Sequence, residues 1–209
     1  MIAIIDYGMG NLRSVQKAFE RFEPDTRIVT TAADILVADK LVLPGVGAFG
    51  DCNRNLRARG LDAPLLERAE KGVPLLGICV GMQLLFTEGE EKGRHAGLNL
   101  IPGRVVRFTG ELKVPQIGWN QVAIQPSGKA LFQGIPDNAD FYFVHSYYPA
   151  PKDPSHTAGL TDYGIPYASA VARGTVFGVQ FHPEKSQKAG LCLIDNFCKF
   201  QARNRIFPS

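Results

Sequence analysis

The fold is decided by the stretch Val73-Pro-Leu-Leu-Gly-Ile-Cys79-Val-Gly-Met-Gln-Leu-Leu-Phe86. Its apolar first part, residues 73–76, predicts a buried strand, and residues 82–86 predict the start of a helix. The turn between them reads Gly-x-Cys-x-Gly, which is the pattern of a nucleophile elbow with a thiol in place of the usual hydroxyl. Two glycines allow the tight turn, and amide groups at a helix N-terminus favour a thiolate and a developing oxyanion. The alternative for Cys79 is a buried, unreactive thiol beside a glycine turn.

Length and composition predict one globular domain that spans residues 1–209. The chain is 45% hydrophobic and 21% charged, which is typical of a soluble protein with a substantial core. Its net charge is +3, and the basic residues are scattered instead of forming the patch that binds nucleic acid. Residues 1–6 predict a first strand and not a signal peptide, and no apolar run reaches transmembrane length. We therefore expect a cytoplasmic protein that binds neither nucleic acid nor a membrane.

Neither the cysteines nor the glycines indicate a metal or a cofactor. The cysteines lack the spacing of a zinc site, and we expect reduced thiols at Cys52, Cys79, Cys192 and Cys198. A zinc site made of Cys79, His145 and His182 would also lack ligand spacing. The Gly-x-Gly at residues 8–10 is missing the third glycine of a dinucleotide-binding loop.

Strands and helices alternate in the first half of the chain, whereas strands dominate the second half. Apolar and alternating runs predict strands over residues 1–6, 27–30, 40–43, 73–76, 105–108, 121–124, 139–144, 167–172 and 175–181. Helical spacing predicts helices over residues 12–22, 48–59, 64–71, from 82 onward, and 191–200. Residues 35–37 are assigned to the approach to the third strand, and residues 88–97 to a surface loop. This order predicts an α/β domain with a mixed, mostly parallel central sheet flanked by helices, and with antiparallel strands in its C-terminal half.

A candidate base stands at the end of the strand expected over residues 175–181. His182 is followed by Pro183 and Glu184. An imidazole can take the proton of a thiol, and a carboxylate two residues later can orient that imidazole. His145 also ends an expected strand and competes for this role, but it has no acid beside it. We therefore favour His182 and Glu184 as the partners of Cys79, since such groups assemble in space and not in sequence.

At these residues the chain resembles a known family. The motifs at residues 77–83 and 181–184 resemble those of the class I (triad) glutamine amidotransferases. Further segments resemble the glutaminase subunits of imidazole glycerol phosphate synthase, and they lie at residues 4–12, 43–49, 118–120, 143–147 and 182–186. Together these segments span nearly the whole chain. The resemblance implies hydrolysis of L-glutamine to glutamate and ammonia.

The resemblance also implies a role for each site residue. Cys79 attacks the carboxamide of glutamine, His182 serves as base and then as acid, and Glu184 orients His182. The amides of Val46 and Val80 are the implied oxyanion donors. The remaining implied substrate contacts are Gly45, Gly47, Gln83, His145, Ser146 and Tyr147.

The implied partner is a (β/α)8-barrel cyclase subunit, with which the chain forms a heterodimer in histidine biosynthesis. Ammonia passes to that subunit and reacts with a phosphoribulosyl nucleotide. Asn11, Trp119 and Tyr142 are the candidate interface residues. Trp119 is the only tryptophan and stands between Gly118 and Asn120, and aromatic anchors are enriched at interfaces. The alternative is that Trp119 packs under a loop. We also expect the Gly45–Val46 peptide to be a switch, since one orientation would place a carbonyl where the oxyanion hole needs a donor.

Three alternatives stay open at this point. One is a Cys-His hydrolase or peptidase of similar architecture, and another is a catalytically silent subunit that only regulates a partner. The third is a glutaminase that feeds ammonia to a different acceptor. The triad motifs argue against the first two, and only the family-specific segments argue against the third.

Overall fold

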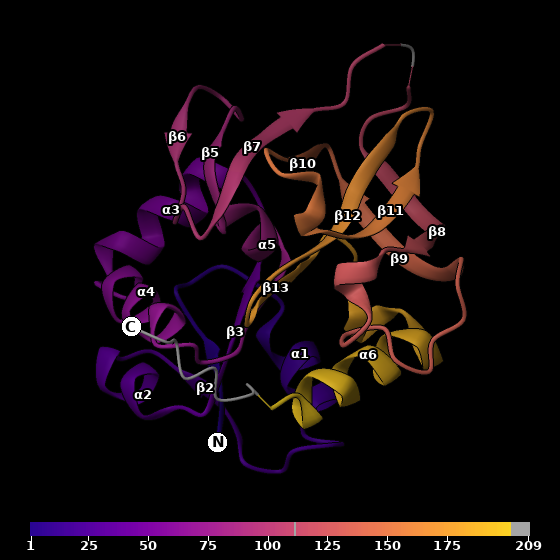
Figure 1. The fold of residues 1–209 in the computed structure, drawn as a ribbon. Coiled ribbons are helices and arrows are strands. Elements are labelled where there is room, and N and C mark those ends of the chain that lie inside the picture. The colour runs from indigo at the N-terminus through magenta and orange to yellow at the C-terminus, as the bar shows by residue number, and fades with distance from the viewer. Residues whose placement is uncertain (111, 202–209) are drawn as a thin grey trace, which may run out of the picture.

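The computed structural model describes residues 1–110 and 112–201. Strands in this part of the chain form two sheets, and helices pack on the larger one (Figure 1). The helices are α1 (Leu12–Phe19), α2 (Ala32–Val37), α3 (Phe49–Ala58), α4 (Asp62–Glu70), α5 (Val80–Leu84) and α6 (Gln187–Lys199). The strands are β1 (Ile2–Ile5), β2 (Thr26–Val29), β3 (Lys40–Gly45), β4 (Leu75–Cys79), β5 (Phe86–Gly89), β6 (His95–Ala96), β7 (Ile101–Arg107), β8 (Gln116–Ile124), β9 (Ala139–His145), β10 (Tyr147–Pro151), β11 (Thr157–Asp162), β12 (Pro166–Arg173) and β13 (Val176–Val179).

The larger sheet has the strand order β2-β1-β3-β4-β13-β12-β11-β8-β9. Neighbouring strands are parallel from β2 to β13. They are antiparallel from β13 to β9. The expectation of an α/β fold with a mixed sheet flanked by helices is confirmed. The parallel part comes mainly from the first half of the chain, and its C-terminal strand ends meet at one edge.

The parallel strands are apolar because the sheet is covered on both faces. Every residue of β1 and of β4 is buried. In Figure 1, helices α2, α3 and α4 lie to the left of strands β3 and β13, and α1 and α6 lie to the right. Helices α1 and α6 pack together through Phe19 and Phe197, whose rings meet edge to face with centroids 6.2 Å apart. Such continuous burial explains why these strands are recognisable as short apolar runs.

The second sheet has the order β10-β7-β5-β6 and lies at the top of the view in Figure 1. The assignment of residues 88–97 to a surface loop is therefore wrong for residues 88–89 and 95–96, which are strand, whereas residues 90–94 form the turn between these strands. Residues Glu88 and Gly89 pair with Ala96 and His95 in an antiparallel hairpin, and β5 also pairs with β7. A polar hairpin of this kind depends on pairing with a strand further along the chain, which no local pattern specifies.

Two other local assignments are corrected by the structure. Residues 35–37 belong to helix α2, which begins at a Thr31 cap whose Oγ1 accepts from the Asp34 amide at 3.2 Å. The helix expected from residue 82 is also wrong in extent, because α5 ends at Leu84. Phe86 instead pairs with Ile101 as the first residue of β5. In the second half, strands β10 and β11 were not expected from the sequence.

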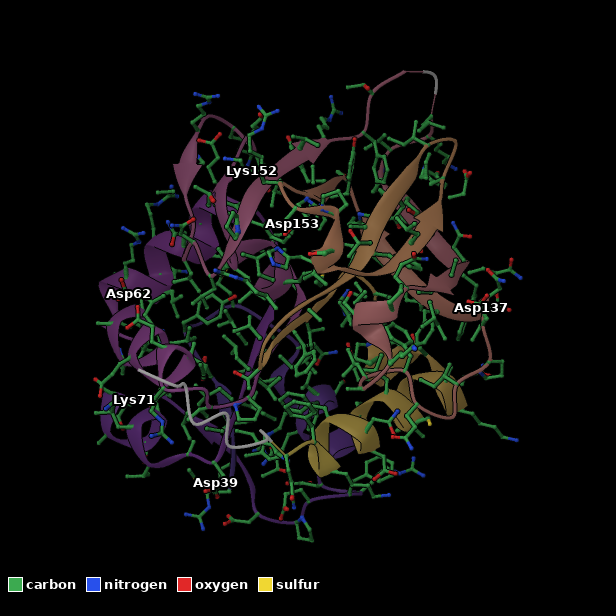
Figure 2. All side chains as sticks on the ribbon, viewed as in Figure 1. Asp39, Asp62, Lys71, Asp137, Lys152 and Asp153 are labelled. Carbon is green, nitrogen blue, oxygen red and sulfur yellow. The ribbon has the colours of Figure 1, made fainter. Side chains whose placement is uncertain are left out.

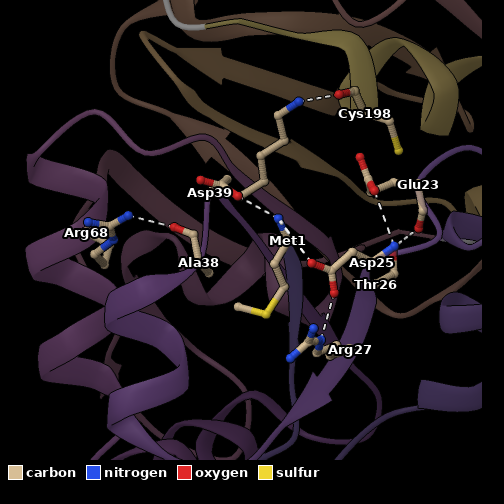
Figure 3. Close-up of polar contacts among 10 residues, drawn as sticks. Met1, Glu23, Asp25, Thr26, Arg27, Ala38, Asp39, Arg68 and Cys198 are labelled. Carbon is tan, nitrogen blue, oxygen red and sulfur yellow. Dashed lines mark hydrogen bonds and ion pairs between the residues drawn. The ribbon is translucent and has the colours of Figure 1, made fainter.

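Polar contacts hold the amino-terminal strand to its neighbours (Figure 3). The Met1 ammonium lies 2.5 Å from the Asp39 carboxylate and 3.8 Å from that of Asp25. Arg68 Nη2 donates to the Ala38 carbonyl at 2.6 Å. The Met1 contacts tie the start of β1 to the turns before β2 and β3, and the Arg68 bond ties α4 to the turn before β3. All of them lie far from the strand ends that form the site.

Of the charged side chains labelled in Figure 2, Asp39, Lys71 and Asp137 lie near the outline of the molecule. Asp39, Lys71 and Asp137 are exposed there, whereas the strands of the sheet point apolar side chains inward. In residues 1–110 and 112–201, no helix is both long enough and apolar enough to cross a membrane.

Candidate active site

Cys79 is the last residue of β4 and stands at a strained turn into α5. Its backbone has φ 56° and ψ −116°, which is unusual for a residue with a side chain. Holding such a conformation costs about 1–3 kcal/mol and is typical of functional turns. Gly81 makes the turn possible, since a Cβ at that position would overlap the carbonyl oxygen of Leu43. The elbow therefore depends on close contact between α5 and β3.

Parallel pairing brings the other candidate groups to Cys79. Strand β4 lies between β3 and β13, with Gly45 beside Cys79 and Val179 beside Ile78. His182 follows β13 by three residues, so it emerges at the same edge of the sheet. Sites in open α/β sheets form at this carboxyl edge.

His182 and Glu184 form a buried pair. His182 Nδ1 lies 3.0 Å from Glu184 Oε1, and the Glu184 side chain is 1% exposed. Burial by itself disfavours the imidazolium, but contacts with Cys79 and with Glu184 outweigh that effect and raise the pKa of His182 to about 10. The thiol, the imidazole and the orienting carboxylate therefore follow one another in space.

A second glutamine, which no sequence motif marks as a site residue, also faces the thiol. Gln180 is fully buried, and its Nε2 lies 3.8 Å from Cys79 Sγ. Gln83 Nε2 donates to Gln180 Oε1 at 3.0 Å and to the Tyr147 carbonyl at 3.1 Å. The bond from Gln83 therefore turns the amide nitrogen of Gln180 toward the sulphur.

The thiol opens into a cavity of about 370 Å³, a volume in the range of small-molecule sites. It lies between the elbow, the turn after β3, and the end of β9. The lining residues are Val46, Gly47, Cys79, Val80, Gln83, Glu91, Pro115, Val144, His145, Ser146, Tyr147, His182 and Lys185.

Most of the expected substrate and oxyanion residues line this cavity, and Gly45 is the exception. Gly45 is buried beside Tyr7 and Val80, where a Cβ would come within 2.6 Å of the Tyr7 hydroxyl. Gln83 lines the cavity, although its amide nitrogen is already bonded to protein groups. The geometry thus places the expected residues other than Gly45 around one volume next to the thiol.

His145 lines the cavity but has both ring nitrogens engaged away from Cys79. Nδ1 donates to the Tyr147 carbonyl at 2.9 Å, and Nε2 lies 3.2 Å from the Tyr167 hydroxyl. Burial lowers the pKa of His145 to about 4, so the imidazole is neutral at pH 7. This favours His182 over His145 as the base, since Cys79 and Glu184 both act on the His182 imidazole and raise its pKa.

Two charged residues of the cavity were also missed. Glu91 reaches it from the hairpin between β5 and β6, and its Oε2 accepts from the Phe49 amide at 2.8 Å. Lys185 directly follows the triad carboxylate, and its Nζ lies 5.9 Å from the ring centre of Tyr142. Lys185 could have been noticed from its position after Glu184, whereas no local signal marks Glu91.

The expected interface residues lie outside the cavity. Trp119 on β8 pairs with Tyr142 on β9, and their ring centroids are 5.9 Å apart. Trp119 is 49% exposed, which is high for a tryptophan, and Ile117 on the same face is 63% exposed. Asn11 is exposed at the start of α1. In the described part of the chain, no group of three or more His, Cys, Asp or Glu side chains is arranged to hold a metal ion.

Comparison with solved structures agrees with this fold. The structure of PurLQS from Thermotoga maritima matches with a TM-score of 0.73 at 17% identity, over 94% of this chain and 96% of that one. The glutaminase domain of Trypanosoma brucei CTPS matches with a TM-score of 0.65 at 17% identity, over 96% and 94% of the two chains. At such identities the likeness concerns the fold alone.

Sequence comparison is more specific. The model of the family "Glutamine amidotransferase class-I" matches residues 3–199. The chain is 55% identical to the imidazole glycerol phosphate synthase subunit HisH of Syntrophotalea carbinolica, over 94% of this chain and 98% of that protein. It is 54% identical to the same subunit of Moorella thermoacetica, over 94% and 93% of the two chains. The resemblance found in the motifs is confirmed, and the chain belongs to the class-I glutamine amidotransferases, among the HisH subunits of imidazole glycerol phosphate synthase.

Proposed function

We propose that this chain hydrolyses L-glutamine to glutamate and ammonia as the glutaminase subunit of imidazole glycerol phosphate synthase. One observation carries the proposal: a strained Cys79 and the buried His182–Glu184 pair meet at one cavity of about 370 Å³, which both Cys79 and His182 line. The named relatives are subunits of that synthase. The reaction needs a nucleophile, a proton carrier and oxyanion donors, and each has a candidate here.

In the first step, Cys79 Sγ attacks the side-chain carboxamide carbon of glutamine. With a pKa of about 10, His182 already holds the proton of the thiol–imidazole pair at pH 7, and the carbonyl oxygen becomes an oxyanion as the carbon–sulphur bond forms. Glu184 stabilises the imidazolium through Nδ1, so that Nε2 is left for the reaction. His182 then protonates the departing nitrogen, ammonia leaves, and a γ-glutamyl thioester remains on Cys79.

In the second step, water attacks the thioester carbonyl carbon. His182 takes a proton from this water and keeps it, the sulphur of Cys79 leaves as the carbon–sulphur bond breaks, and the new carboxyl group releases its proton to solvent. Glutamate leaves, and the enzyme regains its starting protonation state. The amides of Val80, next to the nucleophile, and of Val46, in the turn beside the cavity, are the proposed oxyanion donors in both steps. Removing one such donor typically costs about 10²–10³ in rate.

The cavity also has groups suited to the amino-acid end of glutamine. Glu91 supplies a carboxylate for the α-ammonium, which carries the opposite charge. The backbone at Ser146 and Tyr147, together with the Lys185 ammonium, lies on the cavity wall and suits the α-carboxylate. This charge pattern favours a free amino acid over an internal residue of a peptide.

The partner is proposed to be a barrel-shaped cyclase subunit that binds the exposed face around Trp119 and Tyr142. Ile117 and Trp119 project from the same face of β8, beside Tyr142 on β9. Exposed aromatic residues of this kind commonly anchor interfaces. Asn11 is proposed to extend the contact. Ammonia then reacts in that subunit to give imidazole glycerol phosphate and aminoimidazole carboxamide ribotide; location in the cytoplasm stays a prediction.

The test is glutamate release from L-glutamine by the purified chain. It is measured for the chain alone, with a cyclase subunit, and with that subunit plus its nucleotide ligand. We expect strong turnover in the last mixture only, abolished by Cys79→Ala. Cys192→Ala is the matched control, because Cys192 lies on α6 and its thiol contacts the Gln133 carbonyl.

Other outcomes would redirect the assignment. Equal turnover without a partner would leave a glutaminase and remove the proposed switch. Turnover of a peptide but not of glutamine would support a Cys-His hydrolase. No turnover in any mixture, with Cys79 inert to alkylation, would support a silent regulatory subunit.

A further inference from the structure

Two buried side chains hold the turn that carries the proposed oxyanion donor Val46. The Tyr7 hydroxyl donates to the Pro44 carbonyl at 2.8 Å, and the Cys52 thiol donates to the Val46 carbonyl at 3.3 Å. Tyr7 comes from the segment after β1, and Cys52 comes from the first turns of α3. Both side chains are fully buried. Neither takes part in the mechanism described above.

The two carbonyls lie on either side of one peptide group. The Pro44 carbonyl belongs to the peptide before Gly45, and the Val46 carbonyl belongs to the peptide after Val46. Between them lies the Gly45–Val46 peptide, whose amide hydrogen is the proposed donor to the oxyanion. Anchoring both neighbours restricts the orientations that the middle peptide can adopt, because each anchored peptide is planar and rigid.

Both anchoring groups keep their proton at neutral pH. Burial raises the pKa of Tyr7 well above its usual value, and burial raises the pKa of Cys52 to about 11. They therefore act as a pair of neutral donors toward two carbonyls of the same turn.

Tyr7 also packs directly against the turn. A Cβ at Gly45 would lie 2.6 Å from the Tyr7 hydroxyl oxygen and 3.1 Å from Val80 Cβ. A Gly45→Ala variant would therefore displace Tyr7 as well as change the backbone freedom of residue 45. For this reason Gly45→Ala cannot isolate the expected peptide switch, and removal of single polar atoms is a sharper test.

We propose that Tyr7 and Cys52 are positioning residues that hold the Val46 amide in place as an oxyanion donor. The proposal rests on the proposed glutaminase function and adds two residues that touch neither substrate nor the reacting atoms. Their hydrogen bonds matter in the transition state, when negative charge develops on the carbonyl oxygen of glutamine. Loss of either bond therefore lowers kcat and leaves KM nearly unchanged.

The experiment compares Tyr7→Phe, Cys52→Ala and Cys52→Ser in the full chain with its cyclase subunit and nucleotide ligand. Each of the first two variants loses one neutral hydrogen bond, and we expect kcat for glutamate release to fall about three- to tenfold. Cys52→Ser restores a donor at the same position and should recover part of the loss. The rate of Cys79 alkylation by iodoacetamide should stay near the wild-type rate, because that reaction forms no oxyanion.

Matched controls separate positioning from a general loss of packing. Ser127→Ala removes a hydroxyl-to-carbonyl bond to Thr157, and Cys192→Ala removes a thiol from α6; neither residue lies on the cavity. The inference fails if Tyr7→Phe and Cys52→Ala keep wild-type kcat, or if alkylation falls in step with kcat. Absence of turnover in the wild-type chain would instead overturn the proposed function itself, so the two failures can be told apart.

Discussion

Gln83 Nε2 donates to Gln180 Oε1 at 3.0 Å, and this bond sets which end of the Gln180 amide faces the nucleophile. With its oxygen engaged, Gln180 directs Nε2 toward Cys79 Sγ at a distance of 3.8 Å. The residues come from α5 and from the segment after β13, and they meet because β4 and β13 are parallel neighbours. The amide nitrogen of Gln180 is therefore placed to donate a hydrogen bond to the sulphur of the nucleophile.

Gln180→Leu should lower kcat for glutamate release by about tenfold, because a bond to a charged group is worth about 1.5–3 kcal/mol at normal length and less at 3.8 Å. Gln83→Leu should lower kcat by a similar factor, because Gln180 loses the hydrogen bond that fixes its orientation. Alkylation rates of Cys79 across pH, together with kcat, measure the effect. Gln125→Leu is the control, since its amide bonds the Ala123 carbonyl. Equal losses in the control would contradict a specific role for Gln180.

Glu184→Gln should lower the pKa of His182 from its value of about 10. Burial lowers this pKa, whereas the contacts with Cys79 and Glu184 raise it. The substitution removes the charge of Glu184, so that burial lowers the pKa against a weaker opposing effect. Nitrogen NMR of the labelled imidazole gives the pKa directly. We expect kcat to fall about 10²-fold because the amide no longer stabilises the imidazolium. An unchanged His182 titration would show that Glu184 does not act through this residue.

Stability should decrease in acid because of His145. The pKa of His145 is about 4 in the folded chain and about 6.5 in the unfolded chain. The neutral imidazole therefore makes its full contribution to the free energy of unfolding above pH 6.5, and that contribution is lost as the pH falls toward 4. Titration of His145 contributes at most about 1.4 kcal/mol per pH unit to the slope of the free energy of unfolding against pH. Urea unfolding between pH 4 and 7 measures this slope, and His145→Gln should make it shallower. His156→Gln, at a more exposed histidine, is the control. Identical slopes in wild type and His145→Gln would disprove the assignment.

Trp119→Ala should weaken binding of the cyclase subunit by about tenfold or more, because exposed aromatic anchors often contribute over 1 kcal/mol at interfaces. Calorimetric titration of one subunit with the other measures the Kd. Val37→Ala is the matched control, since Val37 is 71% exposed on α2 at another part of the surface. Melting temperatures of both variants should stay close to wild type. Equal Kd values for wild type and Trp119→Ala would remove Trp119 from the interface.

Features encoded over a few residues could be predicted without the structure. The elbow at Cys79 depends on glycines two residues away on either side, and His182 has its carboxylate partner two residues later. The buried parallel strands were recognisable because burial on both faces requires continuous apolar runs. Strands β10 and β11 and the β5–β6 hairpin were missed because their pairing, and not their composition, makes them strands.

The sequence by itself determined the chemical groups of the site, the α/β order of its first half and the strained turn at Cys79. Only the tertiary structure decided that Gln180 faces the thiol, that Glu91 reaches the cavity, and that Tyr7 and Cys52 hold the turn at Val46. The physical reason is the separation along the chain between the residues that make contact. Backbone turns and neighbouring side chains follow from local sterics, whereas contacts between distant segments follow from strand register and core packing, which the whole chain sets together.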